Sequence, residues 1–98
     1  MATTFRVPAR NYAVEVSGWG PGAEFFRENA TLSESEESRR VVIQHPLMAG
    51  AVVFVRPAAP HAVRNLFPVV YQAESVGFPD RRGRREVTLV RIAAQRYE

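Results

Sequence analysis

The chain has 98 residues, of which 46% are hydrophobic, and a formal net charge of +3. This length predicts one domain with a single modest core. It contains no cysteine, which excludes disulfides, thiolate metal sites and cysteine nucleophiles. No run reaches the ~18 apolar residues of a membrane span, and the first ten residues lack the apolar segment of a signal peptide. We therefore expect a cytoplasmic protein.

Charge is unevenly distributed along the chain. From Glu24 to Ser38 there are five Glu and one Arg, a net of −4, whereas from Phe78 to Arg96 six Arg oppose one Asp and one Glu, a net of +4. An acidic middle and a basic end argue against a uniform nucleic-acid-binding face. They fit strands that pair opposite charges across a sheet.

Glycine and proline separate stretches rich in β-branched and aromatic residues, and no window has helical periodicity. Six short strands at this spacing predict an all-β fold, a small six-stranded antiparallel β-barrel, because closure removes exposed edges. Pro68, inside the fifth strand, marks an edge or a bulge. Residues 1–11 are expected to form a flexible N-terminal arm before one barrel domain, 12–98. The strands are expected at 12–17, 24–32, 39–44, 51–56, 66–75 and 85–93.

Catalytic and metal-binding patterns are missing from the sequence. His45 and His61 stand in separate Pro-flanked loops without a carboxylate cluster, so each is interpreted as a loop histidine. The serines of the polar loop lack the glycines of a nucleophile elbow. We expect neither an enzyme nor a cofactor.

Arg6 and Arg10 precede the first strand and lie four residues apart, so both can turn toward one anionic ligand. Guanidinium is planar, permanently charged and carries five donors, which suits it to grip phosphate or a guanine edge. The alternative is an exposed arm whose arginines pair with Glu34, Glu36 or Glu37, in contacts that contribute about 0–1 kcal/mol each.

The order of Arg-x-x-x-Arg, a strand, a glycine turn, a second strand, a polar loop and a third strand followed by Pro46-Leu47-Met48-Ala49-Gly50 resembles the PilZ domain. The resemblance covers Arg6 to about Ala93. It implies a bacterial regulatory β-barrel in signalling, in which the arginine pair contacts the guanine and phosphate of cyclic di-GMP.

In that family a second motif, Asp/Asn-x-Ser-x-x-Gly, completes the nucleotide-binding pocket. Its positions fall here on Ser33, Ser35 and Ser38, so only the central serine is retained. The intervening glutamates would oppose two phosphates, at about 4 kcal/mol for each contact at ~4 Å and an effective dielectric of ~20. Alternatively, Glu34 takes the acceptor role toward guanine.

Three functional hypotheses follow. The first is a PilZ-like module that senses cyclic di-GMP through Arg6, Arg10, Ser33, Ser35 and Ser38. The second is a degenerate domain that no longer binds nucleotide and acts as a protein-interaction adaptor.

The third hypothesis is a small nucleic-acid-binding barrel that uses the tip at Arg81–Arg85, a stretch otherwise interpreted as a solvated turn, so that nucleic acid is the less favoured partner. Trp19 is either a partner anchor or a lid over the barrel mouth. Phe25 and Phe26 are adjacent in a strand, so one of them must lie outside the barrel.

Overall fold

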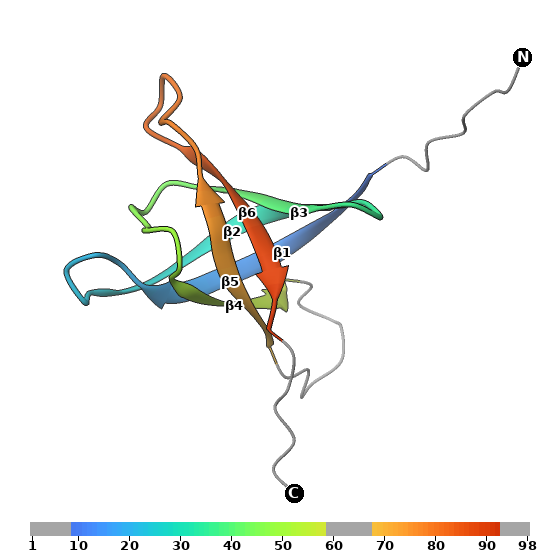
Figure 1. Cartoon of the computed structure of the whole chain (residues 1–98), viewed down its shortest axis with the longest axis horizontal. Helices are drawn as coiled ribbons and strands as arrows, with labels where there is room; N and C mark the ends of the chain where they lie inside the picture. Colours follow the sequence, from blue (N-terminus) through green and yellow to red (C-terminus); the bar gives the residue numbers. More distant parts are fainter. Residues whose placement is uncertain (1–8, 59–67, 93–98) are drawn as a thin grey trace, which may run out of the picture.

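The computed structural model describes residues 9–58 and 68–92, and these form six antiparallel strands that close into one small barrel (Figure 1). Around the barrel the strands follow the order β1-β2-β3-β6-β5-β4, and β4 pairs with β1 to close it. The predicted fold class, a six-stranded antiparallel β-barrel, is confirmed. The strands are β1 (Arg10–Trp19), β2 (Phe25–Glu34), β3 (Arg39–Ile43), β4 (Val52–Pro57), β5 (Val69–Val76) and β6 (Arg85–Arg91).

The core follows from the two-residue alternation of the strands. Val16, Val53 and Val87 are fully buried, one from each of β1, β4 and β6. Branched side chains of this kind pack well against a pleated surface. No polar or charged side chain is buried within residues 9–58 and 68–92. The barrel interior is thus structural, and polar chemistry must take place on its outer surface or at its ends.

The first hairpin is longer than the sequence predicts. β1 and β2 pair over ten residues each, from Arg10 opposite Glu34 to Trp19 opposite Phe25. The expected strands at 12–17 and 24–32 are therefore too short, and Arg10 belongs to a strand. Cross-strand pairing extends both strands beyond the stretch that local alternation marks.

The other boundaries differ by one to three residues. β3 ends at Ile43 and β4 begins at Val52. β5 begins at Val69, directly after Pro68, whereas the sequence places Pro68 inside the strand. Proline has no N–H to give to the ladder, so the strand starts behind it. The expected starting residue of this strand, Leu66, and the expected last residue of the sixth, Ala93, lie outside the described residues.

β2 and β3 form the shortest pairing of the barrel. Their ladder joins Leu32–Glu34 to Arg39–Val41, and the two strands then separate. The Glu28 carboxylate spans the gap and accepts hydrogen bonds from the backbone N–H groups of Gln44, at 2.9 Å, and His45, at 2.8 Å. A side chain thus replaces the backbone ladder at this seam and leaves a groove beside it.

Candidate functional site

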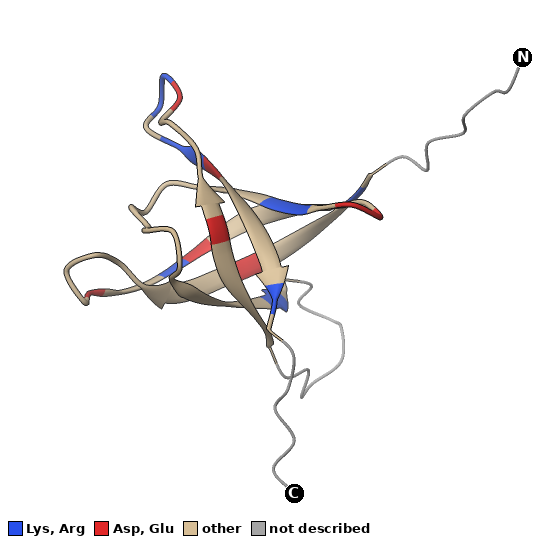
Figure 2. Cartoon of the chain, viewed as in Figure 1, with Lys and Arg blue, Asp and Glu red and all other residues tan. Residues whose placement is uncertain are grey.

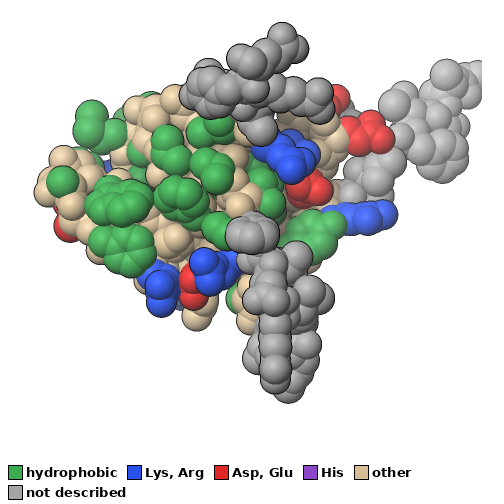
Figure 3. Space-filling view, turned by 90° about the horizontal axis from the view of Figure 1, so that it is seen from below, with side chains coloured by type: hydrophobic (Ala, Val, Ile, Leu, Met, Phe, Trp, Pro, Cys, Tyr) green, Lys and Arg blue, Asp and Glu red, His purple; other side chains and the backbone are tan. Residues whose placement is uncertain are grey.

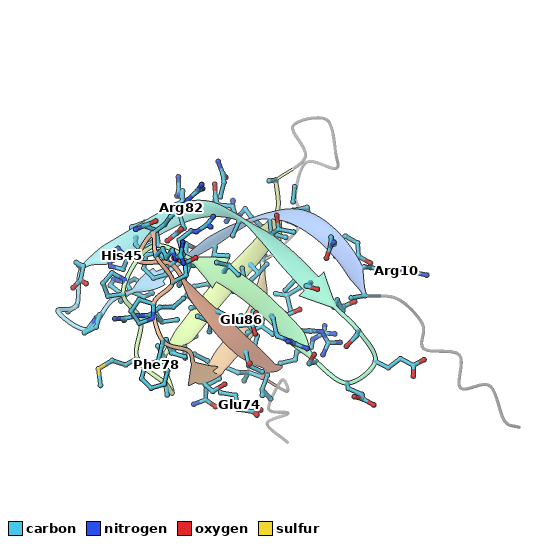
Figure 4. The ribbon with its side chains drawn as sticks, turned by 90° about the horizontal axis from the view of Figure 1, so that it is seen from above. Arg10, His45, Glu74, Phe78, Arg82 and Glu86 are labelled. Carbon is cyan, nitrogen blue, oxygen red and sulfur yellow. The ribbon has the colours of Figure 1, made fainter. Side chains whose placement is uncertain are left out.

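Arg10, predicted as one half of a ligand clamp, is exposed at one end of the barrel (Figure 4). Its ladder partner is Glu34. The Glu34 carboxylate accepts a hydrogen bond from Arg39 Nε at 2.8 Å. In the described ranges no ion pair joins Arg10 to an acidic side chain, so the expected pairing of Arg10 with the glutamates is not found there. Arg6 lies outside the described residues.

The three serines of the predicted second motif do not converge. Ser35 and Ser38 close the β2–β3 turn on itself, because Ser35 Oγ accepts from the Ser38 N–H at 3.2 Å and Ser35 N–H donates to the Ser38 carbonyl at 2.8 Å. Ser33 lies in β2 beside Arg40 of β3 and lines the outer groove. The β2–β3 turn, with Ser35 and Ser38, therefore lies at the barrel end that carries Arg10, whereas Ser33 lies in the groove on the outer surface.

His45 is held by local contacts. Its ring stacks on Phe26, with centroids 4.5 Å apart and planes 6° from parallel, and its Nε2 lies 3.1 Å from Glu24 Oε1. The N–H of Glu24 itself and the His45 ring lower the pKa of the Glu24 carboxyl. In the part of the chain that the structure describes, no three potential ligands gather to hold a metal, and no helix has the length and hydropathy to cross a membrane. His61 lies outside this part.

Aromatic side chains from three strands cluster on the outside of the barrel. The Trp19 ring lies edge-to-face on Phe25, with centroids 5.6 Å apart, and on Phe54, at 6.2 Å. Trp19 is 52% exposed and Phe25 is 54% exposed. The expectation that one of Phe25 and Phe26 lies outside is confirmed, since Phe26 is buried.

Trp19 does not cover the barrel mouth, so the expectation of a lid is wrong. It is the last residue of β1, and the alternation of that strand turns Gly18 inward instead. A Cβ at Gly18 would lie 3.0 Å from the Val52 carbonyl and 3.4 Å from the Phe26 ring. This close approach leaves no room for a large side chain, so the indole lies on the outer surface.

Further apolar side chains extend this cluster over β4, β5 and β6. Phe54 pairs with Val70, whose carbonyl accepts a hydrogen bond from the Ile92 N–H at 3.2 Å. Figure 3 shows hydrophobic side chains gathered on this side of the barrel, with charged side chains at its margin. We call this surface the apolar face, and it comprises Trp19, Phe25, Val52, Phe54, Val70, Val90 and Ile92.

The margin of the apolar face carries an excess of positive charge. Arg27 and Arg56 share one carboxylate, that of Glu15, at 3.5 and 3.7 Å. The Arg27 guanidinium also lies 5.9 Å from the centroid of the Phe25 ring. Two guanidinium groups against one carboxylate leave a net charge of +1 beside the aromatic cluster.

A second surface is the arginine loop, residues 77–84, which projects from the barrel between β5 and β6 (Figure 2). Asp80 organises it, because Oδ1 accepts from the backbone N–H groups of Arg82, at 2.8 Å, and Arg84, at 2.9 Å. These two bonds, that of Arg84 foremost, lower the pKa of the Asp80 carboxyl. Gln44 Nε2 donates to the Arg82 carbonyl at 3.0 Å and ties the loop to the end of β3.

A polar groove of about 580 Å³ runs along the seam between β2 and β3 and reaches the arginine loop. Arg40 and Arg84 lie on one side, and Asn29, Thr31 and Ser33 of β2 lie on the other. Arg40 is also paired with Glu86, at 3.4 Å. The groove has no aromatic lining, so it offers hydrogen bonds and charge rather than a stacking surface.

The chain matches no family model, no curated protein and no solved structure. The resemblance to PilZ domains therefore stays a hypothesis that rests on the order of the sequence motifs. The barrel confirms the fold class, and it leaves the ligand untested.

Sequence reasoning named residues of both outer surfaces, Trp19 and one of Phe25 and Phe26 on the first and Arg81–Arg85 on the second, but it missed how each surface is assembled. The aromatic cluster requires the register of β1 against both β2 and β4, which joins Trp19 to Phe25 and places Ser17 opposite Phe54. The ordering of the arginine loop depends on Asp80. The Asp-x-x-Gly spacing of Asp80 and Gly83 is the signal that would have predicted it, since both residues are favoured in such turns.

Proposed function

We propose that this chain is a small regulatory binding module that engages a protein partner through the apolar face. One observation carries the proposal: Trp19, Phe25 and Phe54 form an aromatic cluster outside the barrel, and two of the three are more than half exposed. Large aromatic side chains are enriched at the energetic centres of protein interfaces. A contiguous exposed apolar surface with a charged margin is typical of an interaction site.

The charge of the margin defines the partner. Arg27 and Arg56 exceed the single carboxylate of Glu15, and their side chains are 62% and 51% exposed. An acidic group on the partner would meet guanidinium groups already held in place, which favours orientation and association rate. The proposed ligand is therefore an apolar protein segment flanked by Asp or Glu.

Selection from a random peptide library on the immobilised domain tests this function. We expect enriched peptides to combine an aromatic or aliphatic anchor with acidic neighbours. Binding of those peptides should fall at least tenfold in Trp19→Ala/Phe25→Ala, since hot-spot truncations cost about 2 kcal/mol or more. The matched control, Arg81→Ala/Arg82→Ala on the opposite hairpin, should bind as the wild type does.

Two outcomes would contradict the proposal. The first is a peptide set that binds the double aromatic variant and the wild type equally. The second is a wild-type dimer in light scattering that becomes monomeric in Trp19→Ala/Phe25→Ala, because the apolar face would then be covered by a second copy of this chain.

Recognition of cyclic di-GMP is a second candidate function, supported by the position of Arg10. It stands exposed beside the β2–β3 turn with no acidic partner among the described residues, so its guanidinium is available to a phosphate. Calorimetric titration into the wild type and Arg6→Ala/Arg10→Ala tests it. Heat that disappears in the variant would support the nucleotide, and no heat at millimolar ligand from a folded protein would remove it.

A further inference from the structure

The arginine loop concentrates positive charge at the point of the molecule farthest from the apolar face along β5 and β6. Arg81, Arg82 and Arg84 lie in the loop and Arg85 follows it, against one carboxylate, that of Asp80. That carboxylate is engaged within the loop, where it accepts two backbone N–H groups and Arg84 Nε at 3.3 Å. Arg81 and Arg82 form no ion pair in the described residues, so their guanidinium groups face solvent.

Hydrogen bonds within the protein fix the conformation of this loop. The Gly83 N–H donates to the Asp80 carbonyl at 3.0 Å, and the Asp80 N–H donates to the Arg84 carbonyl at 2.7 Å. The bond from Gln44 to Arg82 adds an anchor to the barrel. Binding through such a loop therefore loses little backbone entropy, and the charges are already assembled.

Phe78 gives the loop an exposed aromatic ring. It is 97% exposed, the highest value among the large hydrophobic residues that the structure describes. Leaving an aromatic ring in water forgoes about 1.5–3 kcal/mol of burial. Figure 4 shows Phe78 and Arg82 toward the same end of the molecule, at opposite edges of the view. The exposed ring and the guanidinium groups without an ion pair both belong to the arginine loop.

We propose that the arginine loop binds single-stranded nucleic acid, with phosphates contacted by Arg81 and Arg82 and an unpaired base stacked on Phe78. Arginine contacts to phosphate give affinity without sequence preference, and an aromatic face accepts any base. A duplex keeps its base faces stacked inside, so it can meet the arginines but not the Phe78 ring. The groove between β2 and β3 also carries Arg84 and Arg40, but the carboxylates of Glu28 and Glu86 line it too, so the proposed contacts are confined to the loop.

Fluorescence anisotropy with a labelled mixed-sequence oligonucleotide, single-stranded and as a duplex, tests the proposal at several salt concentrations. We expect the single strand to bind more tightly than the duplex. Phe78→Ala should weaken single-strand binding about tenfold and leave duplex binding unchanged. Arg81→Ala/Arg82→Ala should weaken both and reduce the salt slope for the single strand by about 0.7 for each lost phosphate contact.

Two matched controls lie on the apolar face and at its margin. Phe25→Ala removes an exposed aromatic ring, and Arg27→Ala/Arg56→Ala makes the same change in net charge, so both should bind the oligonucleotide as the wild type does. Phe78 and the two loop arginines are outside the core, so circular dichroism of their variants should match the wild type.

The proposal is overturned if no oligonucleotide binds at low salt. It is also overturned if Phe78→Ala and Phe25→Ala bind the single strand equally, or if only the Arg27→Ala/Arg56→Ala variant loses binding. Binding to vesicles that contain anionic lipid, lost in Phe78→Ala while oligonucleotides fail to bind, would assign the loop to a membrane surface instead. These outcomes are independent of the peptide selection on the apolar face.

Discussion

The Glu28 carboxylate takes the place of a ladder partner for His45. If the pairing of Leu32 with Val41 continued along the two strands, Glu28 would lie opposite His45, four residues further on. The strands have separated by that point, and Oε1 of Glu28 accepts the His45 N–H at 2.8 Å instead. The second carboxylate oxygen accepts the Gln44 N–H at 2.9 Å. A charge in this position also discourages another strand from adding to the open edge of β2.

Substitution of Glu28 should therefore destabilise the barrel. Glu28→Ala removes both bonds and leaves two backbone donors with water alone, which should lower the free energy of unfolding by about 1–2 kcal/mol. Chemical denaturation measures the change. Glu74→Ala, on the exposed surface of β5, is the control and should shift the free energy by no more than about 0.5 kcal/mol. Equal stability of the two variants would show that the Glu28 carboxylate does not stabilise the barrel.

Truncation of Phe25 and of Phe26 should differ in its effect on the free energy of unfolding. Phe26 is 6% exposed and packs in the core, so Phe26→Ala should lower the free energy of unfolding by about 3 kcal/mol or more. Phe25→Ala should cost less than about 1 kcal/mol, because its main loss is one edge-to-face contact with Trp19. Denaturation midpoints at matched m-values compare the two variants. A large loss in Phe25→Ala would mean that the apolar face serves stability rather than binding.

The Asp80 carboxyl makes the arginine loop sensitive to acid. Its pKa is held below the usual value of 3.8 by the backbone N–H groups of Arg84 and Arg82 and by the Arg84 charge. Because the folded-state pKa is lower than the unfolded one, the stabilisation is present above pH ~3.8 and is lost as the pH falls through the folded value. The amide NMR shifts of Arg82 and Arg84 should titrate with a midpoint below 3.8 in the wild type. In Asp80→Asn this titration should be absent, and its persistence there would exclude Asp80 as the cause.

The fold could be predicted from sequence because its determinants are local. Apolar residues at every second position, such as Val14 and Val16 in β1 or Val87 and Leu89 in β6, mark the face of a strand that points into the barrel. Glycine and proline mark the turns between strands. The strand ends could not be predicted where pairing decides them: the ladder from Arg10 to Glu34 is a property of two segments together.

The candidate sites were less predictable than the fold, because each depends on register or on a side-chain bond. Ser35 and Ser38 fall in the expected turn, but the Ser35 hydroxyl bonds within that turn and the Ser38 hydroxyl accepts a hydrogen bond from Arg40 Nε at 3.3 Å. Ser33 lies in β2, two residues before Ser35, and lines the groove. The sequence predicts that the first strand ends at residue 17, before Trp19, whereas the pairing of Trp19 with Phe25 makes Trp19 the last residue of β1.

Two hairpin loops of the barrel share one hydrogen-bond pattern and differ at its most strained position. In the β1–β2 loop the Ala23 N–H donates to the Gly20 carbonyl at 2.9 Å, and in the β5–β6 loop the Gly83 N–H donates to the Asp80 carbonyl at 3.0 Å. The fourth residue of each turn has a positive φ, 63° at Ala23 and 78° at Gly83. Glycine adopts this left-handed conformation without steric cost, whereas alanine does not.

Exchanging these residues should therefore change stability in opposite directions. Ala23→Gly relieves a left-handed alanine that costs about 1–2 kcal/mol, partly offset by the greater freedom of glycine in the unfolded chain, so we expect a gain of about 0.5–1 kcal/mol. Gly83→Ala should lose a similar amount by the same reasoning. Urea denaturation of the two variants makes each the control for the other, because both change one methyl group in equivalent loops. A loss of stability in Ala23→Gly would show that the Ala23 methyl group makes a contact that outweighs its backbone strain.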